Sequence, residues 1–176
     1  MRLVAFASLL LALGCSPREP PEWPRGGAPL LIPSARWDRG EADAIEIRSN
    51  GQVLEGGDLV FVVDRVGRVA DADYDPLAIL LPDGRVVGTD DQYLGQIGVT
   101  NAAPPWSTQA WLAVQPDGIA VGFDSDGDRV GFGRWHGCDG PALRTCTLVT
   151  HLLILRRHRS VPPSGVRFGV GMGLWL

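Results

Sequence analysis

Glycine turns recur through the middle of this chain at a nearly constant spacing. Gly51, Gly67, Gly84 and Gly118 stand 16, 17 and 34 residues apart, and a β-branched residue follows each within two positions. Three of them come directly after Asn or Asp, and such pairs favour type I′ hairpin turns because both central residues need a positive φ angle. The same spacing would place another turn glycine near position 101. Asn101–Pro105 stands there instead, and we expect this segment to interrupt the repeat. A repeat of about 17 residues is too short for two helices but accommodates two short strands and two turns.

The runs between these turns have the composition of β-strands. They are Leu59–Asp64, Leu77–Leu81, Tyr93–Val99, Thr108–Val114 and Ile119–Phe123. The 23 glycines and 14 prolines make turns frequent and argue against a helical bundle. We therefore expect an all-β domain over residues 44–176, a meander of short hairpin repeats that forms a small barrel or a sandwich. The alternative is chance glycine spacing in a glycine-rich chain.

The last third of the chain has a different pattern. Thr145–Leu155 is apolar nearly throughout, and its β-branched residues favour a buried strand, with a short core helix as the alternative. Arg156–Arg159 then ends the apolar run. Val166–Leu176 alternates an apolar side with a side of Arg, Gly and Trp, which predicts a final strand. That strand would pack on the core, be donated to the edge of a partner sheet, or close an outer-membrane barrel.

The N-terminus has the pattern of an export signal. Leu3–Leu13 is an apolar stretch of 11 residues, too short to span a bilayer but typical of the centre of a secretory signal. A cysteine directly after Gly14 resembles the lipobox of bacterial lipoproteins. This resemblance implies cleavage after residue 14 and a Cys15 that carries diacylglycerol and a fatty acid such as palmitate. Ala12 stands where the lipobox usually has leucine, and Ala12–Gly14 also suits an ordinary signal-peptide cleavage site. A plain secreted protein and an uncut N-terminal anchor are therefore the alternatives.

Residues 15–43 have the composition of a tether. The segment contains six prolines and shows no strand or helix period; the prolines are Pro17, Pro20, Pro21, Pro24, Pro29 and Pro33. Proline-rich segments are extended and semi-rigid, so we expect this one to hold the β-domain off a membrane surface. Its two aromatic residues, Trp23 and Trp37, are expected to pack loosely on the domain or lie at the lipid interface.

The other two cysteines are expected to bond to each other. If Cys15 is acylated, Cys138 and Cys146 remain as a pair in an oxidising compartment. Closing so short a loop removes about 2–3 kcal/mol of unfolded-state freedom. A zinc site built from this pair with His136 and His151 is the alternative, although the spacing does not match common zinc fingers. His151, within an apolar run, is more typical of a hydrogen-bonded core histidine.

Over residues 44–157 the chain resembles β-repeat lipoproteins of the myxobacterial type. In that group, Asp-Gly-x-Val units follow a lipobox and precede a strongly apolar, arginine-rich segment. The residues that carry the resemblance are Asp83–Val86 and Asp117–Val121, followed by Thr145–Arg157. These motifs reflect turn chemistry, and the resemblance implies no activity.

Two acidic loops are weak candidates for calcium. Asp124, Asp126 and Asp128 alternate as calcium ligands do, but Arg129 and Trp135 occupy the positions of the glycine and glutamate that an EF-hand requires. A hairpin turn at Asp126-Gly127 explains the run equally well. The second loop contains Asp71, Asp73 and Asp75, which we expect to be solvated. We therefore assign no metal or other cofactor.

The functional prediction rests on the export signal and on the catalytic motifs that the chain lacks. The chain has a formal net charge of −4, which gives it no electrostatic reason to bind nucleic acid. It contains no nucleophile elbow, zincin helix or nucleotide-binding loop, so we predict no enzymatic activity and no catalytic residues. We expect a lipoprotein anchored in the cell envelope, in the outer membrane, whose β-domain binds or scaffolds an envelope protein or a glycan. The alternative is a secreted metal-dependent or hydrolytic enzyme that uses the acidic loops or the His/Cys cluster.

Overall fold

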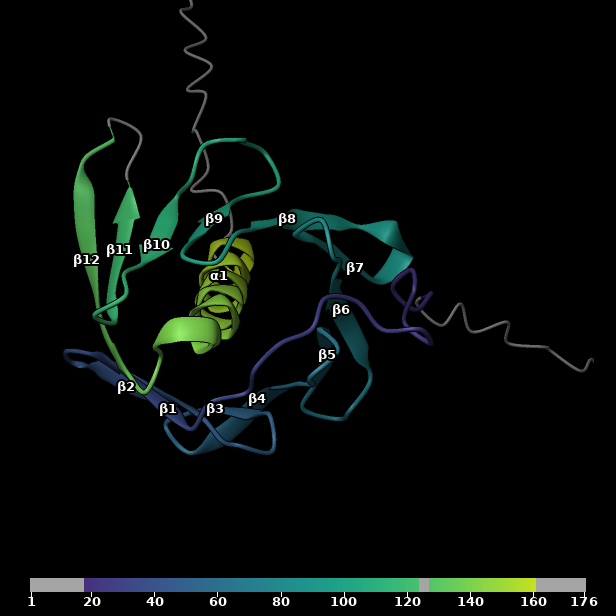
Figure 1. The fold of residues 1–176 in the computed structure, drawn as a ribbon, viewed down its shortest axis with the longest axis horizontal. Coiled ribbons are helices and arrows are strands. Elements are labelled where there is room, and N and C mark those ends of the chain that lie inside the picture. The colour runs from purple at the N-terminus through teal and green to yellow at the C-terminus, as the bar shows by residue number, and fades with distance from the viewer. Residues whose placement is uncertain (1–17, 124–126, 161–176) are drawn as a thin grey trace, which may run out of the picture.

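The computed structural model describes residues 18–123 and 127–160, and within them twelve antiparallel strands close into a barrel (Figure 1). Each strand pairs with the next along the chain, and β12 pairs with β1 to close the ring. The first six strands are β1 (Ala35–Arg39), β2 (Ala42–Ile47), β3 (Gln52–Glu55), β4 (Asp58–Val63), β5 (Arg68–Asp71) and β6 (Pro76–Leu80). The others are β7 (Arg85–Gly88), β8 (Tyr93–Ile97), β9 (Asn101–Ala103), β10 (Leu112–Val114), β11 (Ile119–Phe123) and β12 (Arg129–His136). The predicted all-β meander of hairpins is confirmed, and it forms a barrel.

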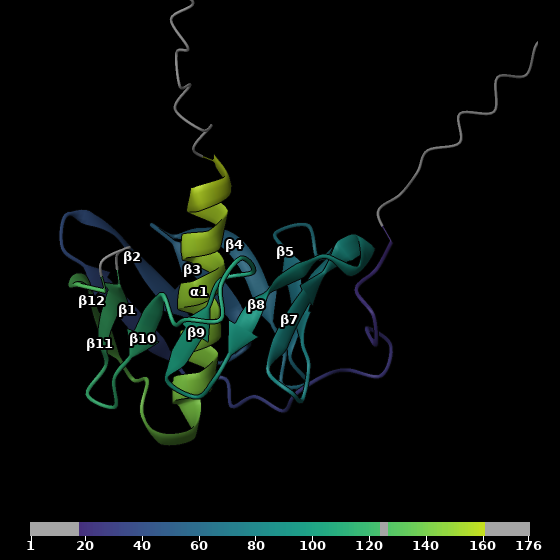
Figure 2. The same ribbon diagram turned by 90° about the horizontal axis from the view of Figure 1, so that it is seen from above.

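The barrel encloses a helix. Two 3₁₀ turns, η1 (Thr89–Asp91) and η2 (Gly140–Ala142), lie outside the sheet, and η2 leads into α1 (Leu143–Ser160). Figures 1 and 2 show α1 running lengthwise through the ring of strands. The core lies between this helix and the inner faces of the strands, where side chains such as Ile45, Val86, Leu112 and Leu148 are fully buried. No helix in the described part of the chain has the length and apolar character needed to cross a membrane.

The helix corrects the preferred prediction of a buried strand over Thr145–Leu155. A strand enclosed by a closed barrel would have no neighbour to pair with, so its buried N–H and C=O groups would lack partners, whereas a helix satisfies its own. The hydroxyl groups of the threonines that favoured a strand instead donate hydrogen bonds to carbonyls of the preceding helical turn. Thr147 donates to the carbonyl of Leu143 at 2.8 Å, and Thr150 donates to that of Cys146 at 2.7 Å. The predicted strand Val166–Leu176 lies outside the described residues.

The repeating glycine turns are confirmed, but their type differs from the prediction. The Gly51 N–H donates to the Arg48 carbonyl at 2.8 Å, and the Arg48 N–H donates to the Gln52 carbonyl at 2.9 Å. Gly51 has a φ of 89°, while Asn50 is not among the residues with positive φ. This is a type I turn followed by a left-handed glycine, a three-residue hairpin loop in place of the two-residue type I′ turn. The same bonding pattern occurs at Gly67, Gly84 and Gly118.

The side chains before these glycines explain the choice of turn. The Asn50 side-chain oxygen accepts from the Gln52 N–H, and the carboxylates of Asp83 and Asp117 accept in the same way from the N–H two residues on. Such side-chain turns suit a type I conformation, with only the glycine left-handed. The expected interruption at 101 is wrong in part, because Asn101–Ala103 forms β9 and the Gly98 N–H donates to the Asn101 carbonyl in the turn before it.

One end of the barrel is closed by the chain before β1. In a meander, alternate connections lie at the same end, so the repeat turns gather at the end where α1 begins. The Gly27 and Ala28 N–H groups donate to the carbonyls of Val66 and Leu80 at this end, at 2.7 Å each. Thr145, near the start of α1, donates to the Leu31 carbonyl at 2.7 Å. We call this the closed end and the opposite end, from which the C-terminal turns of α1 emerge, the open end (Figure 2).

The tether predicted over residues 15–43 is therefore wrong from residue 18 onward. β1 and the first two residues of β2 replace its last part, and Trp37 is buried rather than loosely packed. The Arg18 N–H donates to the Asp90 carboxylate at 3.0 Å, which fixes the first described residue against η1. Trp23 packs against a small buried cluster that includes Ile79. The described prolines, from Pro20 onward, mark a segment that packs on the barrel and closes one end of it without entering its sheet.

Candidate binding site at the open end of the barrel

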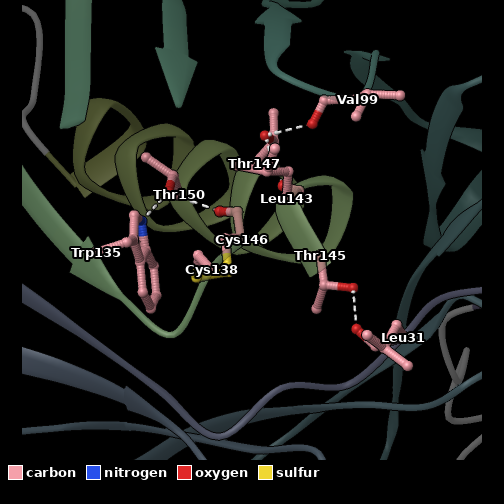
Figure 3. The surroundings of a disulfide bond; sticks show 9 residues. All are labelled: Leu31, Val99, Trp135, Cys138, Leu143, Thr145, Cys146, Thr147 and Thr150. Carbon is pink, nitrogen blue, oxygen red and sulfur yellow. Dashed lines mark hydrogen bonds between the residues drawn. A yellow bond between two sulfur atoms is a disulfide. The ribbon is translucent and has the colours of Figure 1, made fainter. Parts of the chain in front are cut away.

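The predicted disulfide is present. Cys138 and Cys146 are bonded, with their Cα atoms 6.2 Å apart, and both residues are buried. The bond joins the segment after β12 to the first turn of α1, so it fixes the helix at the closed end (Figure 3). Cys15, the predicted lipidation site, lies outside the described residues.

The zinc alternative loses both of its sulfur ligands to this bond. His136 is exposed on β12, and its Nε2 atom lies 3.3 Å from the Asp38 carboxylate. His151 is fully buried in α1. Among the described residues, no group of three or more side chains could hold a metal ion.

The acidic loops are described only in part. Asp124 and Asp126 lie outside the described residues, and Asp128 directly precedes β12. In the other loop, the Asp71 carboxylate accepts from the N–H groups of Asp73 and Asp75 at 2.9 Å each. Asp71 thus stabilises its own turn, as expected of an aspartate at the start of a loop.

His151 is a hydrogen-bonded core histidine, as predicted. The Trp111 indole donates to Nδ1 at 3.0 Å, and Nε2 lies 2.8 Å from the Leu94 carbonyl. An indole N–H can only donate, so Nδ1 is the acceptor and Nε2 carries the proton. Burial lowers the pKa of His151 to about 4, against a smaller opposing effect of the Leu94 carbonyl. The ring fits because position 95 is glycine, where a Cβ atom would lie 2.8 Å from the imidazole.

Three further hydrogen bonds hold α1 in register with the barrel (Figure 3). The Trp135 indole donates to the Thr150 hydroxyl at 2.9 Å, and the Thr147 hydroxyl lies 2.9 Å from the Val99 carbonyl. The third is the bond from Thr145 to Leu31 at the closed end. With the disulfide, these contacts make the helix a fixed inner wall for any pocket between it and the strands.

The open end has a pocket on each side of the emerging helix. The first, which we call the Arg39 pocket, has a volume of about 610 Å³. It is lined by Trp37, Arg39, Gly40, Ala42, Gly131, Phe132, Gly133, Ile154, Arg157 and His158. The second, the Leu155 pocket, has a volume of about 490 Å³ and a mainly apolar lining that includes Phe61, Leu94, Leu152 and Leu155. Both volumes fall in the range of small-molecule sites.

Arg39 is the most constrained polar group of the Arg39 pocket. Its side chain is only 5% exposed. Nε and Nη2 donate to the Asp43 carbonyl, and Nη2 also donates to the Glu55 carboxylate at 2.8 Å. Arg157 donates to the same Glu55 oxygen at 2.7 Å. Two guanidinium groups therefore share one carboxylate, so these three side chains together carry one excess positive charge.

The pKa of Glu55 reflects this arrangement. Burial alone would raise the pKa of the carboxyl group, but hydrogen bonds from Arg39 and Arg157 outweigh that effect and hold the pKa below its usual value. Glu55 stays ionised and keeps both guanidinium groups in place. No Asp or Glu is among the described residues that line the pocket.

Two hydrogen-bond donors of this pocket's lining residues have no partner. The Trp37 indole Nε1 and the Arg39 Nη1 are both buried and unpaired among the described residues. Trp37 stacks on Trp135 with ring centroids 5.5 Å apart, and the Arg39 guanidinium carbon lies 5.4 Å from the Trp37 ring centroid. Buried N–H groups are nearly always paired in folded proteins, so two such donors beside one pocket call for an acceptor.

An aromatic cluster borders the pocket at His158. This imidazole lies 5.3 Å from the Trp111 ring and 6.4 Å from the ring of Trp106, which is 64% exposed. Trp106 and Trp111 meet edge to face at 5.4 Å. The open end thus combines cationic, aromatic and apolar side chains.

Sequence reasoning missed the whole of this site. Arg39 and Trp37 fell within the predicted tether, and Glu55 lies 16 residues after Arg39 on a strand that the turn pattern did not mark. The contact depends on the pairing of β1 with β2 and of β2 with β3, where Ile45 lies opposite Glu55. The available signal was the alternation of apolar Ala35 and Trp37 with polar residues, because an apolar–polar period of two is typical of a strand. Comparison with known proteins gives no matching family model, curated protein or solved structure.

Proposed function

We propose that this chain is a lipid-anchored envelope protein whose barrel is a binding module rather than a catalyst. In this proposal Cys15 carries the lipid in the outer membrane, and the open end of the barrel binds a molecule or partner of the envelope. The observation that carries the binding role is the Arg39 pocket, in which two buried donors lack an acceptor beside a cationic pair. The disulfide supports an oxidising compartment, since such bonds persist outside the cytosol.

The position of Arg18 sets how close the barrel would lie to the membrane. Because Arg18 is hydrogen-bonded to Asp90, only two residues separate Cys15 from the folded barrel. A fully extended chain spans at most about 3.5 Å per residue, so the anchor would hold the barrel within roughly 10 Å of the lipid. The proposal is thus a domain seated at the membrane surface, in contrast to one carried on a long tether.

Metabolic labelling tests the anchor. We expect the chain, expressed in a bacterial host with an alkyne fatty acid, to take up label and to fractionate with membranes. Cys15→Ala should abolish both, while Cys138→Ala should leave the label unchanged because that cysteine is a disulfide partner. Full labelling of the Cys15→Ala variant would refute the anchor.

A further inference from the structure

We propose that the Arg39 pocket binds a carboxylate carried on an apolar or aromatic group, which names the ligand class of the binding module proposed above. The two unpaired donors, Trp37 Nε1 and Arg39 Nη1, belong to residues of one pocket lining. The other two unpaired donors in the described residues, on Arg68 and Arg144, belong to side chains that do not line this pocket. Both pocket donors are N–H groups, so the missing partner is an acceptor.

The charge of the site favours an anionic acceptor. Arg39 and Arg157 both donate to the single carboxylate of Glu55, and no acidic residue lines the pocket among those described. A carboxylate has two oxygens, one for each unpaired donor, and hydrogen bonds to an ionised acceptor are about twice as strong as neutral ones. Arg39 is already held through Nε and Nη2, so its third nitrogen is fixed in position before a ligand arrives.

The walls of the pocket favour an apolar body behind that carboxylate. Trp37 and Phe132 supply aromatic surface, and Ile154 of α1 supplies an aliphatic one. Trp37 is stacked on Trp135, and Trp135 is hydrogen-bonded to Thr150, so this wall is rigid. Pockets lined by apolar side chains with a few fixed polar groups are typical of small-molecule sites. The ligand is a free organic acid or the C-terminal carboxylate of a peptide, which share this chemistry.

Calorimetric titration of the full chain in detergent tests the proposal. The probe is phenylacetate, and its matched control is phenylacetamide, which has the same shape without the charge. We expect saturable binding of the acid and binding of the amide weaker by at least tenfold. A parallel pair, N-acetyl-phenylalanine and an acetylated tripeptide that ends in phenylalanine, distinguishes the sources, because only a pocket that accepts a chain end binds the tripeptide as well as the single residue.

Variants of single donors give the sharper test. Trp37→Phe keeps the stacked ring and removes only the indole N–H, so we expect phenylacetate binding to weaken about tenfold with the fold intact by circular dichroism. Arg39→Gln should abolish binding. Arg36→Gln is the control, since Arg36 lies on the same strand, is exposed and pairs with Asp38 and Glu46 outside the pocket. Binding by Arg36→Gln at the wild-type level is expected.

Two outcomes overturn the inference. One is no saturable binding of phenylacetate or of either peptide probe to the folded wild-type chain, which means that ordered water satisfies the two donors. The other is binding that Trp37→Phe and Arg39→Gln leave unchanged. Either result can occur while Cys15 is labelled, in which case the anchor stands and only the ligand class fails. Binding of phenylacetate by a chain that takes up no label on Cys15 would refute the lipid anchor and support the ligand class of the Arg39 pocket.

Discussion

The indole of Trp111 donates to Nδ1 of His151 at 3.0 Å, and this bond decides the charge of the histidine at the centre of the barrel. A protonated imidazole has a hydrogen on both nitrogens, so it would turn this hydrogen bond into a clash between two donors. The fold therefore holds His151 neutral, with its pKa lowered by burial from 6.5 to about 4.

The first prediction is a loss of stability in mild acid. Between pH 6.5 and 4 the unfolded chain binds a proton at His151 while the folded chain does not, so the free energy of unfolding falls as the pH falls through this window. The effect should reach about 3 kcal/mol at pH 4. Urea unfolding at pH 7 and pH 4.5 measures it, with His151→Gln expected to lose this part of the pH dependence. His136→Gln, at an exposed histidine, should retain it; an unchanged pH dependence in His151→Gln would contradict the assignment.

The second prediction concerns the repeat turns. Gly118 has a φ of 85°, and a Cβ atom there would lie 2.1 Å from the Trp135 carbonyl oxygen. Gly127 has the same φ of 85°, but among the described residues no contact within 4 Å of a Cβ is found there, which makes it a matched control. Gly127→Ala should cost only the left-handed strain, about 1 kcal/mol, whereas Gly118→Ala should cost about 3 kcal/mol or more because the backbones must separate. Chemical denaturation compares the two, and equal losses would show that close approach plays no part.

The turns show how far the sequence determines this fold. The glycine spacing predicted the meander because a left-handed residue at the end of each hairpin loop is a local requirement that few residues other than glycine meet. Asn50, Asp83 and Asp117 are typical of type I′ turns, but their side chains accept from the N–H two residues on and select the type I turn. The local sequence thus predicts each turn and its position, whereas the type of turn depends on the hydrogen bond that the side chain accepts.

The helix and the pocket could not be predicted in the same way. Thr145–Leu155 has strand propensity, and only the closed ring of strands around it removes the possible strand partners. Local propensity is weaker than this tertiary requirement. The Arg39 pocket likewise joins β1, β12 and α1, segments far apart in the chain, so no local pattern could bring Arg39 and Arg157 to one carboxylate.

The third prediction concerns the disulfide. The Cys138–Cys146 bond closes a loop with a sequence separation of eight residues and fixes the first turn of α1. Reduction should lower the free energy of unfolding by about 2–3 kcal/mol. Urea titrations with and without dithiothreitol measure this. The double variant Cys138→Ala/Cys146→Ala should unfold at the same urea concentration with and without dithiothreitol. If the reductant still destabilised this variant, its effect would come from another residue.

The fourth prediction tests whether α1 is held by the bond between Trp135 and Thr150. Thr150→Val removes the acceptor and leaves the buried Trp135 indole N–H unpaired, so it should cost about 2 kcal/mol of unfolding free energy. It also removes the bond from Thr150 to the Cys146 carbonyl, which is lost equally in a Trp135→Phe background and cancels in the comparison. The same substitution in Trp135→Phe should therefore cost about 1 kcal/mol less. A double-mutant cycle with no coupling would mean that this hydrogen bond does not contribute and that the helix is held in register by its other contacts.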